Sequence, residues 1–198
     1  MESLDQPCVA VTLPGYGLTA HDASDVSPEA LARTLLSELE ARGLTSATLV
    51  GHSASCQVVA EAATQAPGTA NRLVLIGPTT DPSARSWQRL AARWAATARR
   101  ENPRLAPSLA RQYTKTGLGS MLRCLEAARH HDILKALGNN TRPLLVVRGR
   151  HDTIANTNWI DRVADAGRGR ARTLSAGGHM VVSTHGSLVA QAIRQPED

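Results

Sequence analysis

The chain has 198 residues, of which 42% are hydrophobic, and this is enough to bury the core of one domain. Aromatic residues make up only 3% and phenylalanine is absent, so the core must be aliphatic. The formal net charge is +5, but the positive residues are scattered and aromatic platforms for base stacking are lacking, which argues against nucleic-acid binding.

The first half of the chain predicts strands alternating with one-sided helices. The apolar run at 7–13 predicts a buried strand, and Pro14-Gly15-Tyr16-Gly17 predicts a loop after it. Ser27 is a capping residue before Pro28, and leucines recur at helical spacing until Gly43, so a helix is expected there. A strand, a helix and a strand should follow, at residues 45–50, 54–66 and 72–78.

The segment from 79 to 141 has a different character, with helical patterns rich in Ala and Arg that prolines interrupt. After it, the alternation resumes with a strand, a helix, a short strand and a closing helix, at residues 143–147, 158–166, 171–174 and 187–194. This order predicts an α/β fold with a mostly parallel sheet. We expect a core formed by 1–78 and 142–198, and a helical lid formed by 79–141.

A short motif of small residues stands between the strand at 45–50 and the helix after it, namely Gly51-His52-Ser53-Ala54-Ser55. A strand that turns sharply into a helix around a serine is a nucleophile elbow. The turn lifts the hydroxyl clear of the backbone, beside the first amides of the helix, where negative charge is favoured. Ser53 is therefore the candidate nucleophile.

Two later loops carry the residues that a serine nucleophile needs. Asp152 follows the strand at 143–147, and His179 lies on a glycine-rich turn after the strand at 171–174. Parallel strands gather such residues at their carboxyl ends, so we expect Ser53, Asp152 and His179 to converge. An imidazole activates a serine hydroxyl, and a carboxylate orients the imidazole. The backbone amide of Ala54 is the natural first donor to an oxyanion.

Five pieces of the chain, in this order, resemble α/β-hydrolase-fold serine enzymes of the esterase and C–C hydrolase type with a helical cap. They are Leu13-Pro14-Gly15-Tyr16-Gly17, Leu49-Val50-Gly51-His52-Ser53, Leu73-Val74-Leu75-Ile76-Gly77-Pro78, Val146-Val147-Arg148-Gly149 with Asp152, and Gly178-His179. The resemblance implies Ser53 as nucleophile, His179 as base and Asp152 as acid. It implies hydrolysis of a small-molecule ester, thioester or related carbonyl without a cofactor, or cleavage of a C–C bond by the same triad.

Other residues compete for these roles. Asp81 follows the strand at 72–78, where some family members carry their acid, and His185 is a spare base. His52 is interpreted as a packing residue. The adjacent histidines 130 and 131 do not indicate a metal site, because adjacent side chains rarely face one ion. The lid arginines could steer an anionic substrate, but a solvated helix face explains them better; they are Arg85, Arg89, Arg93, Arg99 and Arg100. Trp87 and Trp94 are expected to hold the lid to the core, and one of them could line an acyl pocket.

The family pattern is incomplete at its start. No strand followed by a His-Gly loop precedes the elbow, so the sheet is expected to lack its N-terminal strands and the second oxyanion donor. An unpaired sheet edge would favour a homo-oligomer. The alternative function is therefore a non-catalytic homologue that acts as a binding scaffold.

The cysteines and the hydropathy of the sequence indicate the cellular compartment of the protein. Three widely spaced cysteines form no C-x-x-C pair, so neither a zinc site nor a disulfide framework is indicated. No apolar run approaches the length of a membrane span, and the N-terminus does not resemble a signal peptide. We expect a cytoplasmic protein that does not bind membranes.

Overall fold

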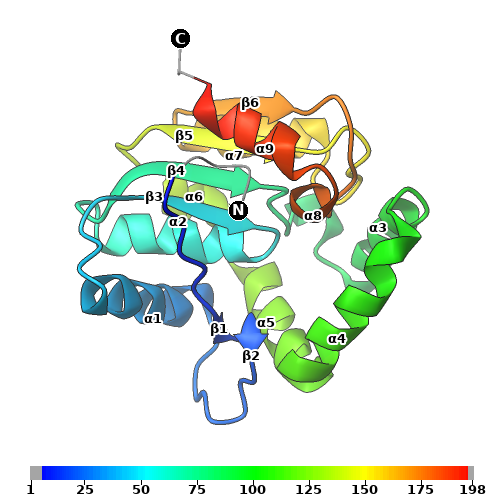
Figure 1. Ribbon diagram of the computed structural model, residues 1–198, viewed down its shortest axis with the longest axis horizontal. Helices are drawn as coiled ribbons and strands as arrows, with labels where there is room; N and C mark the ends of the chain where they lie inside the picture. Colours follow the sequence, from blue (N-terminus) through cyan, green and yellow to red (C-terminus); the bar gives the residue numbers. More distant parts are fainter. Residues whose placement is uncertain (1–5, 196–198) are drawn as a thin grey trace.

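The computed structural model describes residues 6–195. Its centre is a four-stranded parallel sheet in which the strands lie in chain order: β3 (Ala47–His52), β4 (Ala70–Ile76), β5 (Leu144–Arg148) and β6 (Arg170–Thr173) (Figure 1). The strands coincide with the predicted ones to within a few residues. Because all four run in the same direction, their carboxyl ends share one edge of the sheet.

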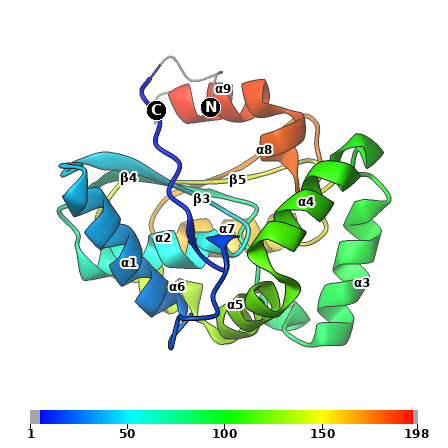
Figure 2. The ribbon, with the colours of Figure 1, turned by 60° about the horizontal axis from the view of Figure 1, so that its bottom comes forward.

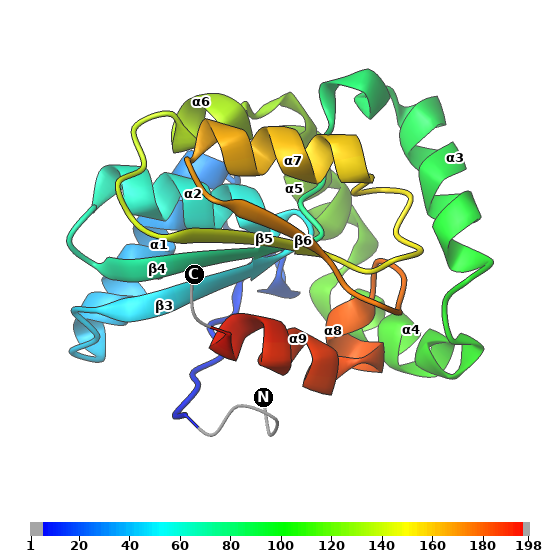
Figure 3. The same ribbon diagram turned by 90° about the horizontal axis from the view of Figure 1, so that it is seen from above.

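Helices cover both faces of this sheet (Figure 3). One face carries α1 (Pro28–Ala41), α2 (Ser55–Gln65), α6 (Ile133–Leu137) and α7 (Thr157–Ala166), and the other carries α8 (Val181–Thr184) and α9 (Gly186–Arg194). The side chains of β4 alternate between the two layers. Leu73 and Leu75 pack with α2 and α7, whereas Val74 and Ile76 pack with Val189 of α9. This explains why β4 is apolar throughout.

The helical insertion lies between β4 and β5, beyond the carboxyl ends of the strands (Figures 1 and 2). It contains two short 3-10 turns, η1 (Pro82–Ala84) and η2 (Pro103–Leu105), and the helices α3 (Trp87–Ala98), α4 (Ala106–Thr116) and α5 (Leu118–His130). We call α3, α4 and α5 the cap. The helix that follows, α6, buries Ile133 and Leu137 in the main core rather than in the cap. The exact division of the chain at 79 and 141 therefore stays a prediction.

The predicted strand at 7–13 is wrong. Residues 7–12 form no strand and are mostly exposed, and of this run Leu13 alone is buried. Leu13 belongs instead to a two-residue strand, β1 (Leu13–Pro14), which pairs with β2 (Gly17–Leu18). An apolar run becomes a strand in a sheet only where it forms backbone hydrogen bonds with a neighbouring strand, and residues 7–12 do not pair with the outer side of β3.

β3 is an edge strand with an open outer side. Among residues 6–195 it pairs only with β4, and Val50 in its middle is 48% exposed. Val50 pairs with Val74, which packs against α9, so Val50 lies on the same face of the sheet, but α9 packs over β4 and β5. Within the same residues, no helix is both long and apolar enough to cross a membrane.

Candidate active site

The turn between β3 and α2 holds Ser53 in a strained conformation. Its φ is 59°, in the left-handed region that non-glycine residues rarely adopt, and its amide donates to the Ile76 carbonyl at 2.9 Å. Gly51 is required because a Cβ there would lie 2.9 Å from the Cα of Cys56. Ser55, which stands where the motif usually has glycine, closes the turn: its hydroxyl accepts from the His52 amide and donates to the His52 carbonyl.

Asp152 is buried in the loop after β5. Its Oδ1 accepts hydrogen bonds from the amides of Ile154 at 2.8 Å and Ala155 at 3.0 Å. These bonds leave Oδ2 free to face His179. Two such hydrogen bonds fix the rotamer of the carboxylate.

Arg148, at the end of β5, organises the same loop and was not predicted to do so. Its buried guanidinium donates to the carbonyls of Ala155 at 2.6 Å and Asp152 at 2.5 Å, and to the Thr157 hydroxyl at 3.1 Å. Burial lowers the pKa of Arg148, and the charge of Asp152 opposes this shift. The available signal in the sequence was an arginine at the last position of an otherwise apolar strand.

His179 completes a continuous chain of hydrogen bonds. Its Nδ1 lies 2.9 Å from Asp152 Oδ2, and its Nε2 lies 2.9 Å from the Ser53 hydroxyl. With the Nδ1 proton donated to the carboxylate, Nε2 is the acceptor for the serine proton. The structure thus brings together the three side chains that the sequence selected, from three different loops.

Two glycines allow the loops to approach this closely. A Cβ on Gly149 would lie 2.3 Å from the Gly178 carbonyl oxygen, and the two loops are joined there by a bond from the His151 amide to the Gly177 carbonyl. Gly77, after β4, has a φ of 56°, and a Cβ on it would lie 3.1 Å from Asp152 Oδ2 and 3.2 Å from His179 Nδ1. Each glycine therefore makes room for the Asp152–His179 pair or its loops.

His52 packs against His179. The two ring centroids are 5.2 Å apart, and His52 Nε2 lies 2.8 Å from the His179 carbonyl oxygen. Burial, together with the nearby His179, lowers the pKa of His52 to about 4. His52 is therefore neutral at pH 7, and its Nε2–H donates to that carbonyl.

The rival residues lie elsewhere. Asp81 is bound by Arg93, 2.8 Å away, and by the Ser83 amide; burial would raise the pKa of Asp81, but these hydrogen bonds outweigh it and lower the pKa. His185 Nδ1 contacts the Thr184 hydroxyl. Trp87 is 40% exposed and donates to Glu126, so it lies on the outer surface of the cap.

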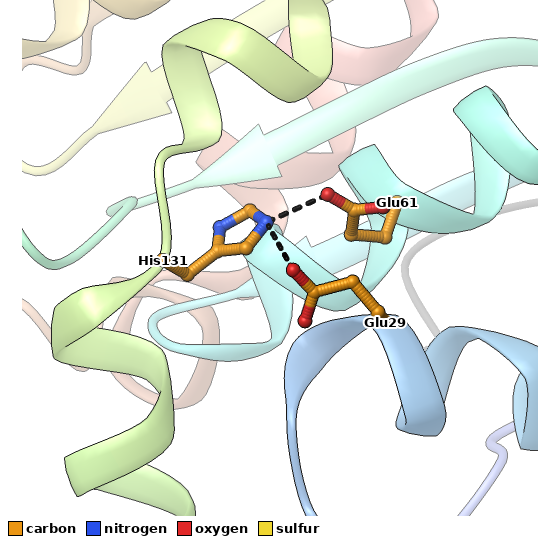
Figure 4. Close-up of side chains that lie close together, drawn as sticks. All are labelled: Glu29, Glu61 and His131. Carbon is orange, nitrogen blue, oxygen red and sulfur yellow. Dashed lines mark hydrogen bonds and ion pairs between the residues drawn. The ribbon is translucent and has the colours of Figure 1, made fainter.

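One described group could hold a cation, and it joins the cap to the core (Figure 4). His131, just after α5, lies with Nε2 2.7 Å from Glu61 on α2 and 3.9 Å from Glu29 on α1. A histidine that binds a metal through Nε2 donates its Nδ1 proton to an acceptor. Here Nδ1 is buried without a partner, so the group fits a His131–Glu61 hydrogen bond better than a metal site.

In the described chain, the amide of Ala54, at the start of the elbow helix, makes no backbone hydrogen bond outside the helices and strands. It directly follows Ser53 and is half-buried. The amide thus has the position and the spare donor capacity that an oxyanion needs.

Comparisons with known proteins identify a family and similar solved structures. The family model described as "Alpha/beta hydrolase family" matches residues 2–192. A hydrolase from Pseudomonas aeruginosa is similar in structure, with a TM-score of 0.67 and 24% identity over 84% of this chain and 70% of that chain. A hydrolase from Oleispira antarctica is also similar, with a TM-score of 0.72 and 16% identity over 85% of this chain and 71% of that chain. The enol-lactonase from Burkholderia xenovorans has a TM-score of 0.66 and 19% identity over 84% of this chain and 71% of that chain. No curated protein matches.

Proposed function

Because the chain belongs to the alpha/beta hydrolase family, we propose that it is a serine hydrolase that cleaves a carboxylic ester, a thioester or a related carbonyl compound. Family membership supports a hydrolase. The observation that carries the finer proposal is the chain of hydrogen bonds from the buried Asp152 through the buried His179 to Ser53, with both contacts at 2.9 Å.

The proposed reaction has two halves. The Ser53 oxygen attacks the carbonyl carbon while its proton passes to His179 Nε2, and Asp152 stabilises the imidazolium. The developing oxyanion is placed beside the Ala54 amide. The leaving group takes the proton from His179 and departs, which leaves an acyl group on Ser53. A water molecule then gives a proton to His179, attacks the acyl carbon and releases the acid. Ser53 regains its proton.

A fluorophosphonate probe tests the nucleophile directly. We expect one adduct, on Ser53, and no adduct in Ser53→Ala or His179→Ala. The matched controls are His185→Ala and Asp81→Asn, which change a histidine and an aspartate of the same regions without touching the chain of hydrogen bonds. Both should react like the parent protein. Asp152→Asn should slow hydrolysis of an activated ester by about 10³- to 10⁴-fold.

The outcome also decides between an enzyme and a scaffold. Folded protein that does not react with the probe would support the non-catalytic alternative. Equal reactivity of the His179→Ala variant would remove the triad from the proposal. If simple esters are not cleaved although Ser53 reacts, a ketone substrate with a cleavable adjacent C–C bond is the next to be tried, since it needs the same three residues.

A further inference from the structure

Positive charge surrounds a single acid in the part of the insertion that precedes Glu126. Between residues 82 and 125 the sequence has nine Arg or Lys residues and a single acidic residue, Glu101. Glu101 stands just after α3, next to Arg99 and Arg100. Its carboxylate nevertheless turns towards the core of the molecule. It accepts a hydrogen bond at 2.8 Å from the amide of Met180, the residue after His179.

The carboxylate of Glu101 also touches the other side of the His179 turn. A Cβ on Gly178 would lie 2.4 Å from Glu101 Oε1 and 2.9 Å from its Cδ, so Gly178 leaves the space that the carboxylate occupies. Glu101 therefore contacts the residues on both sides of His179. Trp94, seven residues earlier, contacts the His179 ring itself, edge to face, with centroids 5.3 Å apart.

The same stretch of the cap holds the Asp152 loop. The Thr97 hydroxyl lies 2.6 Å from the Thr153 hydroxyl and accepts from the Thr153 amide at 3.2 Å. The Thr153 hydroxyl in turn donates to the Arg93 carbonyl at 2.9 Å, and Arg100 donates to His151 Nδ1 at 3.1 Å. One helix and its last turn thus bind both loops that carry the partners of Ser53.

We propose that Glu101 is a positioning residue for His179, and that α3 acts as a fixed brace across the His179 and Asp152 loops rather than as a freely moving lid. The proposal rests on the proposed function in one respect, namely that His179 is the base. The Met180–Glu101 hydrogen bond sets the turn, and the turn sets the imidazole 2.9 Å from both of its partners. Misplacement of a catalytic group by about 1 Å costs on the order of 10²-fold in rate.

Three substitutions of Glu101 distinguish the effect of the length of its side chain from the effect of its charge. Glu101→Gln keeps an acceptor oxygen at the same reach, so kcat for an activated ester should stay within about threefold of the parent. Glu101→Asp keeps the charge but is one methylene too short, and Glu101→Ala loses the acceptor. Both should lower kcat by about 10- to 100-fold with KM nearly unchanged, because the substrate is not contacted. Glu126→Ala, which removes an exposed cap carboxylate that pairs with Arg129, is the control and should keep its kcat.

Proton NMR tests the role of Glu101 without requiring any enzymatic activity. The Nδ1 proton that His179 shares with Asp152 should give a downfield proton resonance in NMR, lost in His179→Ala. We expect the resonance to persist in Glu101→Gln and to broaden or disappear in Glu101→Ala and Glu101→Asp while the rest of the spectrum stays folded. If the parent protein neither reacts with the probe nor cleaves esters, the proposed function fails, and this measurement still tests the brace.

The results that overturn the brace are distinct. A folded Glu101→Ala variant with unchanged kcat and unchanged resonance would show that the contact does not position His179. A Glu101→Gln variant as slow as Glu101→Ala would show that the charge acts, not the hydrogen bond. A rise in KM with kcat unchanged would place Glu101 against the substrate instead.

Discussion

At the scale of single residues, two neighbours of His179 besides Ser53 and Asp152 carry no charge at neutral pH. His52 lies against its ring and donates to its carbonyl, and Gly77 lies against its Nδ1. Both residues come from the carboxyl ends of adjacent strands, β3 and β4. Small changes at either position should therefore reach the Asp152–His179 pair.

His52 should make the stability of the protein sensitive to acid. Its pKa is about 4 in the folded protein, against about 6.5 in an unfolded chain, so the unfolded chain binds the proton first. The contribution of neutral His52 to the free energy of unfolding is fully present above pH 6.5, and it is lost as the pH falls towards 4. His52→Gln removes this contribution, so its free energy of unfolding should decline less between pH 7 and 4, by up to about 3 kcal/mol.

Urea unfolding of the parent, His52→Gln and the exposed-site control His130→Gln at several pH values measures this effect. The control should follow the parent curve. If the free energy of unfolding falls equally with pH in all three proteins, the pKa of His52 is not lowered in the folded protein.

Gly77→Ala should impair the site by contact as well as by backbone strain. The new methyl group would press on Asp152 Oδ2 and His179 Nδ1 at 3.1–3.2 Å. Gly43→Ala is a matched control, since Gly43 has a φ of 66° and nothing lies within 4 Å of its added Cβ. Both variants should lose about 1 kcal/mol of stability, and Gly77→Ala alone should lose activity, about tenfold or more in kcat. Equal activities would show that the pair has room to adjust.

At the scale of elements, the loop after β5 depends on a polar group that the strand itself supplies. The loop from Gly149 to Asn156 has no regular secondary structure, yet Asp152 in it is buried. Arg148 supplies the hydrogen bonds that such a buried loop requires. β5 therefore positions Asp152 through its last side chain as well as through its backbone.

Arg148→Met should be strongly destabilising, because it leaves the carbonyls of Asp152 and Ala155 without their donor. We expect a loss of about 3 kcal/mol or more in the free energy of unfolding. Arg148→Lys should not restore it, since one ammonium group cannot reproduce the planar fork of donors. Arg170→Met, at an exposed arginine of β6, is the control. A loss below 1 kcal/mol for Arg148→Met would show that water replaces the guanidinium.

At the scale of the whole molecule, the outer edge of β3 is the feature that bears on assembly. Its strand partner on the inner side is β4, and Val50 is half-exposed beside the open edge. Exposed edges pair readily with other strands, so association of two copies through β3 stays a prediction.

Light scattering across a range of concentrations should detect a dimer of the parent protein that Val50→Lys abolishes, because a lysine at a sheet edge opposes pairing. Leu118→Lys is the control, since Leu118 is 66% exposed on the cap and far from β3 in the chain. It should dimerise like the parent. A parent protein that stays monomeric at every concentration would contradict the prediction.

The sequence by itself determined the alternation of strands and helices, the elbow around Ser53, and the selection of Asp152 and His179. These features depend on local signals: apolar periodicity, capping residues, and small residues at tight turns. Local signals also misled at 7–13, where most of an apolar run pairs with no strand. The tertiary structure alone decided the roles of Arg148, His52 and Glu101. Each of these binds backbone groups of a buried loop, and which loop comes within reach depends on how elements distant in the chain pack together.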